Sequence, residues 1–259
     1  MKPPIRASDA RAADIPGPAA ATPDADLGPE WPWQSCLLPF AVFILIGLFE
    51  PVPSGGGLAG ALGIPYSVYP LIYALRIVAT LAAVGAFWPP IRRWIGRTTW
   101  WPLPLGIGLV VPWIVLATLQ RELGWAPAAT ERSGFNPFEQ FAAGSATGWA
   151  FLAVRMIGLV AVVPLVEELF LRGFLMRYVI NEDFWTVPFG TLSAASAAAC
   201  LVYALATHPG EAIAAVCWFA VVSGIAAATR RPIDAILAHA GTNLALGCYV
   251  LATGNWWLM

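Results

Sequence analysis

Two adjacent glutamates and a nearby arginine stand inside a long apolar stretch of this 259-residue chain. Glu167 and Glu168 precede Arg172 in the run that extends from residue 162 to residue 176. An ionisable side chain at membrane depth costs on the order of 3 kcal/mol or more, so such residues indicate function. Glu168 and Arg172 are spaced i, i+4 with the acid first, the better order for a helical ion pair. Glu167 points about 100° away and is left to face another group.

The two histidines of the chain follow on later apolar segments. His239 and Asn243 are spaced i, i+4, so they share one helix face and could reach the same ligand. The alternative for this pair is a hydrogen-bonded contact between two membrane helices. His208 stands beside Pro209, and its alternative is a loop histidine at the water interface.

Carboxylate and imidazole groups together can hydrolyse an amide, which needs an activated water, a stabilised oxyanion and a proton for the leaving amine. In one scheme Glu167, His208 and His239 ligate a divalent metal, with zinc as the candidate, and the metal lowers the pKa of its bound water to about 7. In the other scheme Glu167 and His208 activate the water, while His239 and Asn243 hold the oxyanion. No HExxH is present, so the usual zincin geometry is not expected. We favour a metal-capable site.

The elements that position these residues are predicted to be membrane helices. The chain is 59% hydrophobic and 11% charged with a mean hydropathy of +0.70, whereas soluble domains carry about 25% charged residues. We predict an all-α, polytopic transmembrane helix bundle with about seven crossings, eight being the alternative. The apolar stretches lie near residues 34–49, 66–87, 102–119, 156–176, 188–207, 212–228 and 233–252. A net charge of −1 and the lack of a long basic run argue against nucleic acid as a partner.

Two regions are expected along the chain. Residues 1–30, rich in Ala, Pro and Asp, predict a flexible cytoplasmic tail without the apolar core of a signal peptide. Residues 31–259 predict one transmembrane helical domain, with the catalytic motifs in 148–249. Alternate loops carry the basic residues, namely Lys2, Arg6, Arg11, Arg92, Arg93, Arg97, Arg177, Arg230 and Arg231. This pattern predicts a cytoplasmic N-terminus.

Tryptophans fall near the predicted crossing ends, as an aromatic belt would. They are Trp31, Trp33, Trp88, Trp94, Trp100, Trp101, Trp185, Trp256 and Trp257. The cysteines Cys36, Cys200, Cys217 and Cys248 form no CxxC pair and are interpreted as small buried hydrophobic residues.

Two polar residues raise questions of position. A straight helix starting at Pro188 would carry His208 out of reach of Glu167. We therefore expect either a later start and a short or tilted helix, or a turn that dips back into the membrane. Arg76, inside the second apolar stretch, is expected to pair with Glu50 or with backbone carbonyls.

The order Glu-Glu-x-x-x-Arg, then His, then His-x-x-x-Asn on three successive apolar segments resembles the CAAX prenyl endopeptidases and their bacterial relatives, the CPBP intramembrane proteases. The resemblance covers about residues 148–249. The family usually has Phe four residues before its first histidine, whereas this chain has Ala204 with Tyr203 adjacent. The stretch 172–207 is also similar to a subgroup of CAAX protease-related proteins found alongside bacterial protein-sorting systems.

The resemblance implies an intramembrane endopeptidase in the bacterial inner (cytoplasmic) membrane, with Glu167 and His208 activating water and His239 and Asn243 as partners. Its substrate would be a membrane-associated or lipidated peptide or protein that reaches the site from the cytoplasmic face or from within the bilayer. The alternative is a non-proteolytic membrane interaction or immunity-type protein that keeps a vestigial polar site. A transporter is disfavoured because the chain shows no inverted repeat.

Overall fold

The computed structural model describes residues 33–125, 134–142 and 144–259. These residues form helices joined by turns, and no β-strand occurs among them. The prediction of an all-α protein is therefore confirmed. The predicted tail, residues 1–30, lies outside the described residues, as does Trp31.

Five helical units in the described part of the chain are long and apolar enough to cross a membrane. They are Tyr66–Ala86, Pro102–Glu122, Ala146–Tyr178, Pro209–Thr229 and Pro232–Thr253. Two further apolar helices, α1 (Gln34–Gly47) and α11 (Ala194–Thr207), have 14 residues each. Each rises about 21 Å, which is short of a hydrocarbon core of about 30 Å. Each of the seven predicted stretches contains a helix, but seven crossings stay a prediction.

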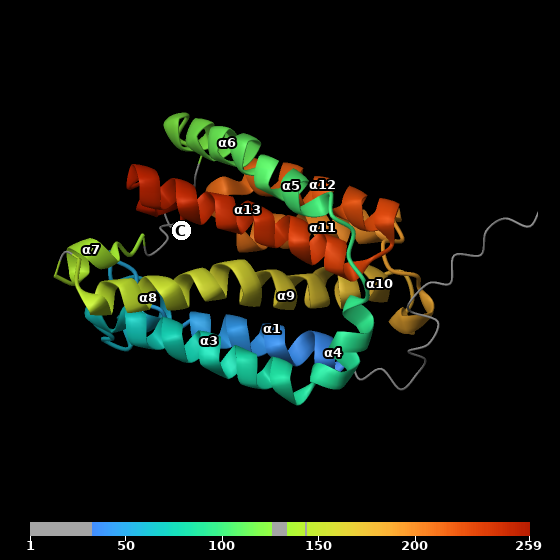
Figure 1. Ribbon diagram of the computed structural model, residues 1–259, viewed down its shortest axis with the longest axis horizontal. Helices are drawn as coiled ribbons and strands as arrows, with labels where there is room; N and C mark the ends of the chain where they lie inside the picture. The colour runs from blue at the N-terminus through green and yellow to red at the C-terminus, as the bar shows by residue number, and fades with distance from the viewer. Residues whose placement is uncertain (1–32, 126–133, 143) are drawn as a thin grey trace, which may run out of the picture.

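A long helical unit runs between two layers of helices (Figure 1). It consists of α8 (Ala146–Ile157), α9 (Val163–Glu168) and α10 (Met176–Tyr178), joined by the π-helical turns η3 (Gly158–Val162) and η4 (Leu169–Leu175). One layer holds α1, α3 (Tyr69–Ala86) and α4 (Trp88–Ile95). The other holds α5 (Pro102–Gly108), α6 (Val110–Glu122), α11, α12 (Ala212–Thr229) and α13 (Pro232–Thr253). Shorter helical turns are α2 (Gly57–Ala61), η2 (Tyr66–Val68), α7 (Pro137–Gln140), η5 (Phe184–Thr186), η6 (Pro209–Glu211) and η7 (Trp256–Leu258).

The helices α5 and α13 approach closely because glycines line their contact. A Cβ atom on Gly106 would lie 2.0 Å from the carbonyl oxygen of Ala238, and one on Gly241 would lie 2.8 Å from that of Leu103. Small residues allow this kind of backbone approach between membrane helices. The Thr242 hydroxyl donates to the Gly106 carbonyl oxygen at 2.7 Å. This contact fixes the helix that carries His239 and Asn243.

Two buried charged residues fasten loops to the helices. The Asp234 carboxylate, at the start of α13, accepts from the Thr99 backbone N–H at 2.9 Å and from the Thr98 and Thr99 hydroxyls at 3.1 and 3.0 Å. The Arg177 guanidinium donates to the Val187 carbonyl oxygen at 2.8 Å. Arg177 is 1% exposed, and its hydrogen bond holds the loop that follows α10 against the helix.

The aromatic-belt prediction is wrong for Trp94. Its side chain is fully buried and packs edge-on against Phe189, with ring centroids 5.6 Å apart, so it cannot lie at a lipid interface. Trp33, Trp88 and Trp100 are exposed, as residues of such a belt would be.

The prediction of buried cysteines holds for two of the four. Cys36 and Cys200 are buried, whereas Cys217 and Cys248 are free thiols exposed on the outer faces of α12 and α13. The prediction is wrong for Cys217 and Cys248, because apolar sequence in a membrane protein covers lipid-facing surface as well as core.

Candidate active site

The predicted catalytic glutamates lie on a short α-helical segment between two π-helical turns. The segment α9 contains both Glu167 and Glu168, with η3 before it and η4 after it. Pro164 stands at its start, where its missing N–H removes one α-helical hydrogen bond. The π turn that precedes Pro164 accommodates the missing hydrogen bond. Such π turns occur often at functional sites.

Glu168 is held in the predicted ion pair with Arg172. The Arg172 Nη1 donates to both carboxylate oxygens, at 2.5 and 2.6 Å, and Nη2 donates to the Phe219 carbonyl oxygen at 3.0 Å. Glu168 is 0% and Arg172 2% exposed, so the pair lies in a low-dielectric environment. A second contact was not predicted: His239 Nδ1 lies 3.2 Å from Glu168 Oε1. Because a carboxylate accepts, this contact places a proton on Nδ1.

His239 stands between the two glutamates. Its Nε2 lies 3.9 Å from Glu167 Oε2, on the other side of the ring from Glu168. The Trp218 ring packs against the imidazole with centroids 4.5 Å apart, and the Trp218 Nε1–H donates to the Thr242 hydroxyl at 3.0 Å. These contacts fix the ring plane and aim Nε2 toward Glu167.

The helix α11 is short, as one of the two expectations for His208 requires. It begins at Ala194, six residues after Pro188, with Ser193 and Ser196 in a reciprocal capping box. It ends at Thr207, so His208 is the first residue of the turn. The Gln120 side chain of α6 binds this turn, donating to the Gly210 carbonyl oxygen at 3.0 Å and accepting from the Ile213 N–H at 3.0 Å.

Thr207 sets the proton position on His208. Its hydroxyl donates to the Tyr203 carbonyl oxygen at 2.8 Å and lies 2.8 Å from His208 Nδ1. Because the hydroxyl hydrogen is used by Tyr203, the oxygen accepts from an Nδ1–H of His208. In the neutral imidazole this arrangement leaves the lone pair on Nε2, the form that a general base needs.

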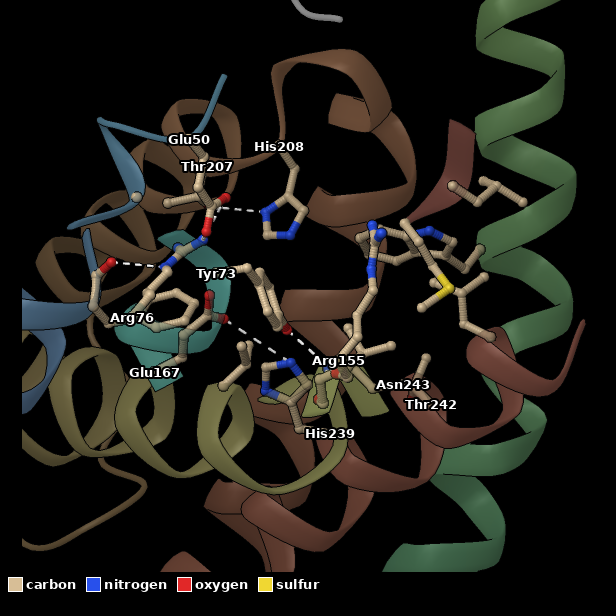
Figure 2. Close-up of a pocket in the computed structure, with 18 of the residues that line it drawn as sticks. Glu50, Tyr73, Arg76, Arg155, Glu167, Thr207, His208, His239, Thr242 and Asn243 are labelled. Atoms are coloured by element: carbon tan, nitrogen blue, oxygen red, sulfur yellow. Dashed lines mark hydrogen bonds and ion pairs between the residues drawn. The ribbon is translucent and has the colours of Figure 1, made fainter. Parts of the chain in front are cut away.

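The four predicted catalytic residues line one cavity of about 390 Å³. Glu167, His208, His239 and Asn243 all contribute to its wall, and Figure 2 shows the two histidines on opposite sides of the space, with Glu167 near His239. Trp113 and Trp218 form the wall between the histidines, with ring centroids 6.2 Å apart. The structure therefore brings together side chains that are separated by up to 76 positions in the sequence.

Asn243 has a structural role at this wall. Its Nδ2 donates to the Leu159 carbonyl oxygen of η3 at 2.8 Å. The interhelical hydrogen bond that was the alternative for this residue is therefore present. An amide carries two N–H groups, so the second remains for a ligand in the cavity.

The metal prediction can be compared with the positions of its ligands. Among the described residues, no group of three or more His, Cys, Asp or Glu side chains is arranged to hold a metal ion. The donor types suit zinc, and Nδ1 of each histidine is held by an oxygen, as metal-ligating histidines usually are. Zinc binding by Glu167, His208 and His239 therefore stays a prediction.

Several cavity residues were not selected as site residues by sequence reasoning. Arg76 donates to both oxygens of Glu50 at 3.0 Å and to the Phe43 carbonyl oxygen at 2.8 Å, which confirms both partners expected for it. Burial raises the pKa of the Glu50 carboxyl, against the lowering effect of Arg76. Arg155 lies on α8 and is 4% exposed. The sequence did not indicate Trp113 and Trp218 as cavity residues, because apolar residues in an apolar helix cannot be told apart by type or spacing.

The comparison with protein families agrees with this geometry. Residues 140–245 match the model of the Rce1-like type II CAAX prenyl endopeptidase family. This part of the chain is therefore similar to that family. The matched range contains every residue of the predicted site, which lies between positions 167 and 243, and the resemblance seen in the sequence is confirmed. No curated protein and no solved structure matches the chain significantly. The family domain and the apolar helices together indicate a protease that is an integral membrane protein.

Proposed function

We propose that the protein is an intramembrane endopeptidase that hydrolyses a peptide bond of a membrane-associated or lipidated substrate inside the cavity. The observation that carries the proposal is the position of Glu167. It lines the cavity together with both histidines, while the neighbouring Glu168 is occupied by Arg172 and His239. Adjacent carboxylates thus have separate tasks, one chemical and one structural.

The reaction uses Glu167 and His208 to activate a water molecule. Their basic atoms face one cavity, where a peptide carbonyl can be placed between the two walls. As the water oxygen forms a bond to the carbonyl carbon, its proton passes to the base and the carbonyl electrons move onto oxygen. Collapse of the tetrahedral intermediate breaks the C–N bond, and the proton is then transferred to the leaving amine. General acid–base catalysis of this kind contributes about 10²- to 10⁴-fold to a rate.

His239 and Asn243 are assigned to the developing oxyanion. A protonated His239 can donate from Nε2, because Glu168 accepts from Nδ1 and holds the ring in place. The second N–H of Asn243 is available beside it. A donor of this type is worth about 10²- to 10³-fold in kcat.

Zinc is the alternative activator in the proposal. Glu167, His208 and His239 would be its ligands, and the ion would supply a bound water with a pKa near 7. Among the described residues these side chains do not form one three-ligand group, so the steps proposed for water activation use the protein groups alone.

We also infer seven crossings, with α1 and α11 as the short ones, and a cytoplasmic N-terminus in a bacterial inner membrane. The charge pattern of the loops supports this orientation. It places the loop after α1, which includes Glu50, Pro51 and Val52, on the outer side. These three residues line the same cavity as Glu167, so one end of the cavity reaches that loop.

The proposal is tested by cleavage of internally quenched apolar peptides by the purified protein in lipid. Glu167→Gln and His239→Gln are expected to lower kcat/KM at least about 10²-fold. Glu182→Gln, an exposed carboxylate outside the cavity, is the matched control and should retain wild-type activity. Full activity in Glu167→Gln would remove the proposed mechanism. Loss of activity with a chelator, restored by zinc, would favour the metal scheme.

A further inference from the structure

One stripe of residues on the long helical unit contributes to the cavity wall. Arg155, Leu159, Val163 and Glu167 follow each other at intervals of four residues, and all four contribute to the cavity wall. The stripe therefore joins the proposed catalytic acid to a cation along one continuous surface. Its two middle members are apolar, as a channel for an extended peptide would be.

Arg155 is a buried cation without a carboxylate partner among the described residues. Its Nη1 donates to the Phe135 carbonyl oxygen at 2.9 Å, and its guanidinium lies 5.7 Å from the centre of the Tyr69 ring. It is 4% exposed. Burying an unpaired charge is costly, and a guanidinium has five N–H donors in a geometry that matches a carboxylate. One donor is used by Phe135, which leaves others for an anion in the cavity.

Glu50 attracts the Arg155 guanidinium electrostatically, but no ion pair joins these two side chains among the described residues. Glu50 lines the same cavity, but both of its oxygens accept from Arg76, whose guanidinium stacks on Phe43 at 3.5 Å. Arg76 and Glu50 therefore form a closed pair. Among the described arginines and acids that line the cavity, Arg155 and Glu167 do not belong to this pair, and they lie at opposite ends of the stripe (Figure 2).

We propose that Arg155 binds a carboxylate of the substrate peptide and thereby sets the distance from that carboxylate to the scissile bond. This inference rests on the proposed function of the same cavity. Arg155 precedes Glu167 by twelve residues, which corresponds to about 18 Å along a helix. An extended peptide covers about 3.4 Å per residue, so the bound carboxylate lies about five residues from the cleaved bond.

The experiment uses quenched peptides of alanine, leucine and valine, amidated at the C-terminus, with a single glutamate that is moved along the chain. Cleavage sites are mapped by mass spectrometry. The wild type is expected to cut at a constant separation of about five residues from the glutamate, so moving the glutamate by two residues moves the cut by two. In Arg155→Gln the cut should no longer follow the glutamate. Two more peptides complete the set. One carries glutamine in place of the glutamate, and the other has a free C-terminal carboxylate as its sole acid.

Equilibrium binding gives a readout that does not depend on catalysis. With the Glu167→Gln protein, the glutamate peptide is expected to bind about tenfold to a hundredfold more tightly than the glutamine peptide, the usual range for a hydrogen bond to a charged group. Adding Arg155→Gln should abolish the difference, while Arg155→Lys should keep part of it. Arg92→Gln, an exposed arginine of α4, is the control and should change nothing.

These two measurements separate the inference from the function on which it rests. Equal binding of both peptides by a folded protein overturns the carboxylate site, whether or not peptides are cut. A preference that survives Arg155→Gln overturns the assignment to Arg155. If binding depends on Arg155 but Glu167→Gln still cleaves, the carboxylate site stands and the proposed catalytic role of Glu167 fails.

Discussion

Replacing Glu168 and Arg172 by methionine, singly and together, should separate the stability that this buried pair provides from its effect on His239. In Glu168→Met the Arg172 guanidinium, 2% exposed, loses its carboxylate partner and stays buried. Breaking a buried pair in this way costs about 3–5 kcal/mol. At about 2–4 °C per kcal/mol for a chain of this size, the Tm should fall by roughly 6–20 °C.

The double variant should recover most of that loss. With both charges gone, no unpaired ion remains, and apolar replacements of buried ion pairs are often neutral or stabilising. Activity should not recover, because His239 Nδ1 still lacks the Glu168 oxygen that lies 3.2 Å away in the wild type. Removing a carboxylate that orients a functional histidine costs between about 10²- and 10⁴-fold.

The assay measures Tm in detergent by intrinsic fluorescence and kcat/KM with the quenched peptides, for the wild type, both single variants and the double variant. Glu182→Gln, exposed in the loop after α10, controls for loss of a carboxylate elsewhere. A double variant that regains activity together with stability would refute the orienting role of Glu168. An unchanged Tm in Glu168→Met would refute the energetic argument for the pair.

Three further predictions follow from the packing and the charges. Gly106→Ala should lower the Tm, since its Cβ would lie 2.0 Å from a carbonyl oxygen of α13 and overpacking costs about 1–3 kcal/mol. Gly108→Ala is the control and should keep the wild-type Tm, because its Cβ would have no atom within 4 Å. Equal Tm values for the two variants would contradict this packing. Gln120→Leu should lower kcat/KM for the quenched peptides and cost about 1–3 kcal/mol of stability, because the turn that carries His208 loses the hydrogen bonds of the Gln120 amide. A wild-type kcat/KM would argue against this role. Because burial raises the pKa of Glu50, the folded protein holds this proton to a higher pH than the unfolded chain does, so stability should fall as pH rises from about 4.3 through the raised pKa. Glu50→Gln should remove this fall of the Tm with rising pH. Identical profiles of Tm against pH for the variant and the wild type would refute the contribution of Glu50.

The local features of the site could be predicted from the sequence because helical spacing determines them. The Glu168–Arg172 ion pair follows from an i, i+4 interval, and the structure contains it. The different tasks of Glu167 and Glu168 follow from the angle between neighbours on a helix. The partners of Arg76 were also expected, since a buried arginine has few acceptors within reach.

Contacts between distant segments could not be predicted in the same way. The hydrogen bond between Glu168 and His239 joins residues 71 positions apart, and no spacing rule links two separate helices. Trp218, which packs on His239, is one apolar residue among many. The exposed Cys217 shows the same limit, since hydropathy does not distinguish a side that faces lipid from one that faces protein.

The π-helical turn η3 has a consequence for the phase of the long helix. In an uninterrupted α-helix, the twelve residues from Arg155 to Glu167 make three full turns and leave the two side chains about 120° apart. Such a helix could not present both to one cavity. The turn Gly158–Val162 is closed by i→i+5 bonds and takes up about one additional residue, which rotates the later part back by about 100°. A cation and a carboxylate thus face one space because the helix between them carries a single extra residue, and a one-residue deletion there would turn them to different sides.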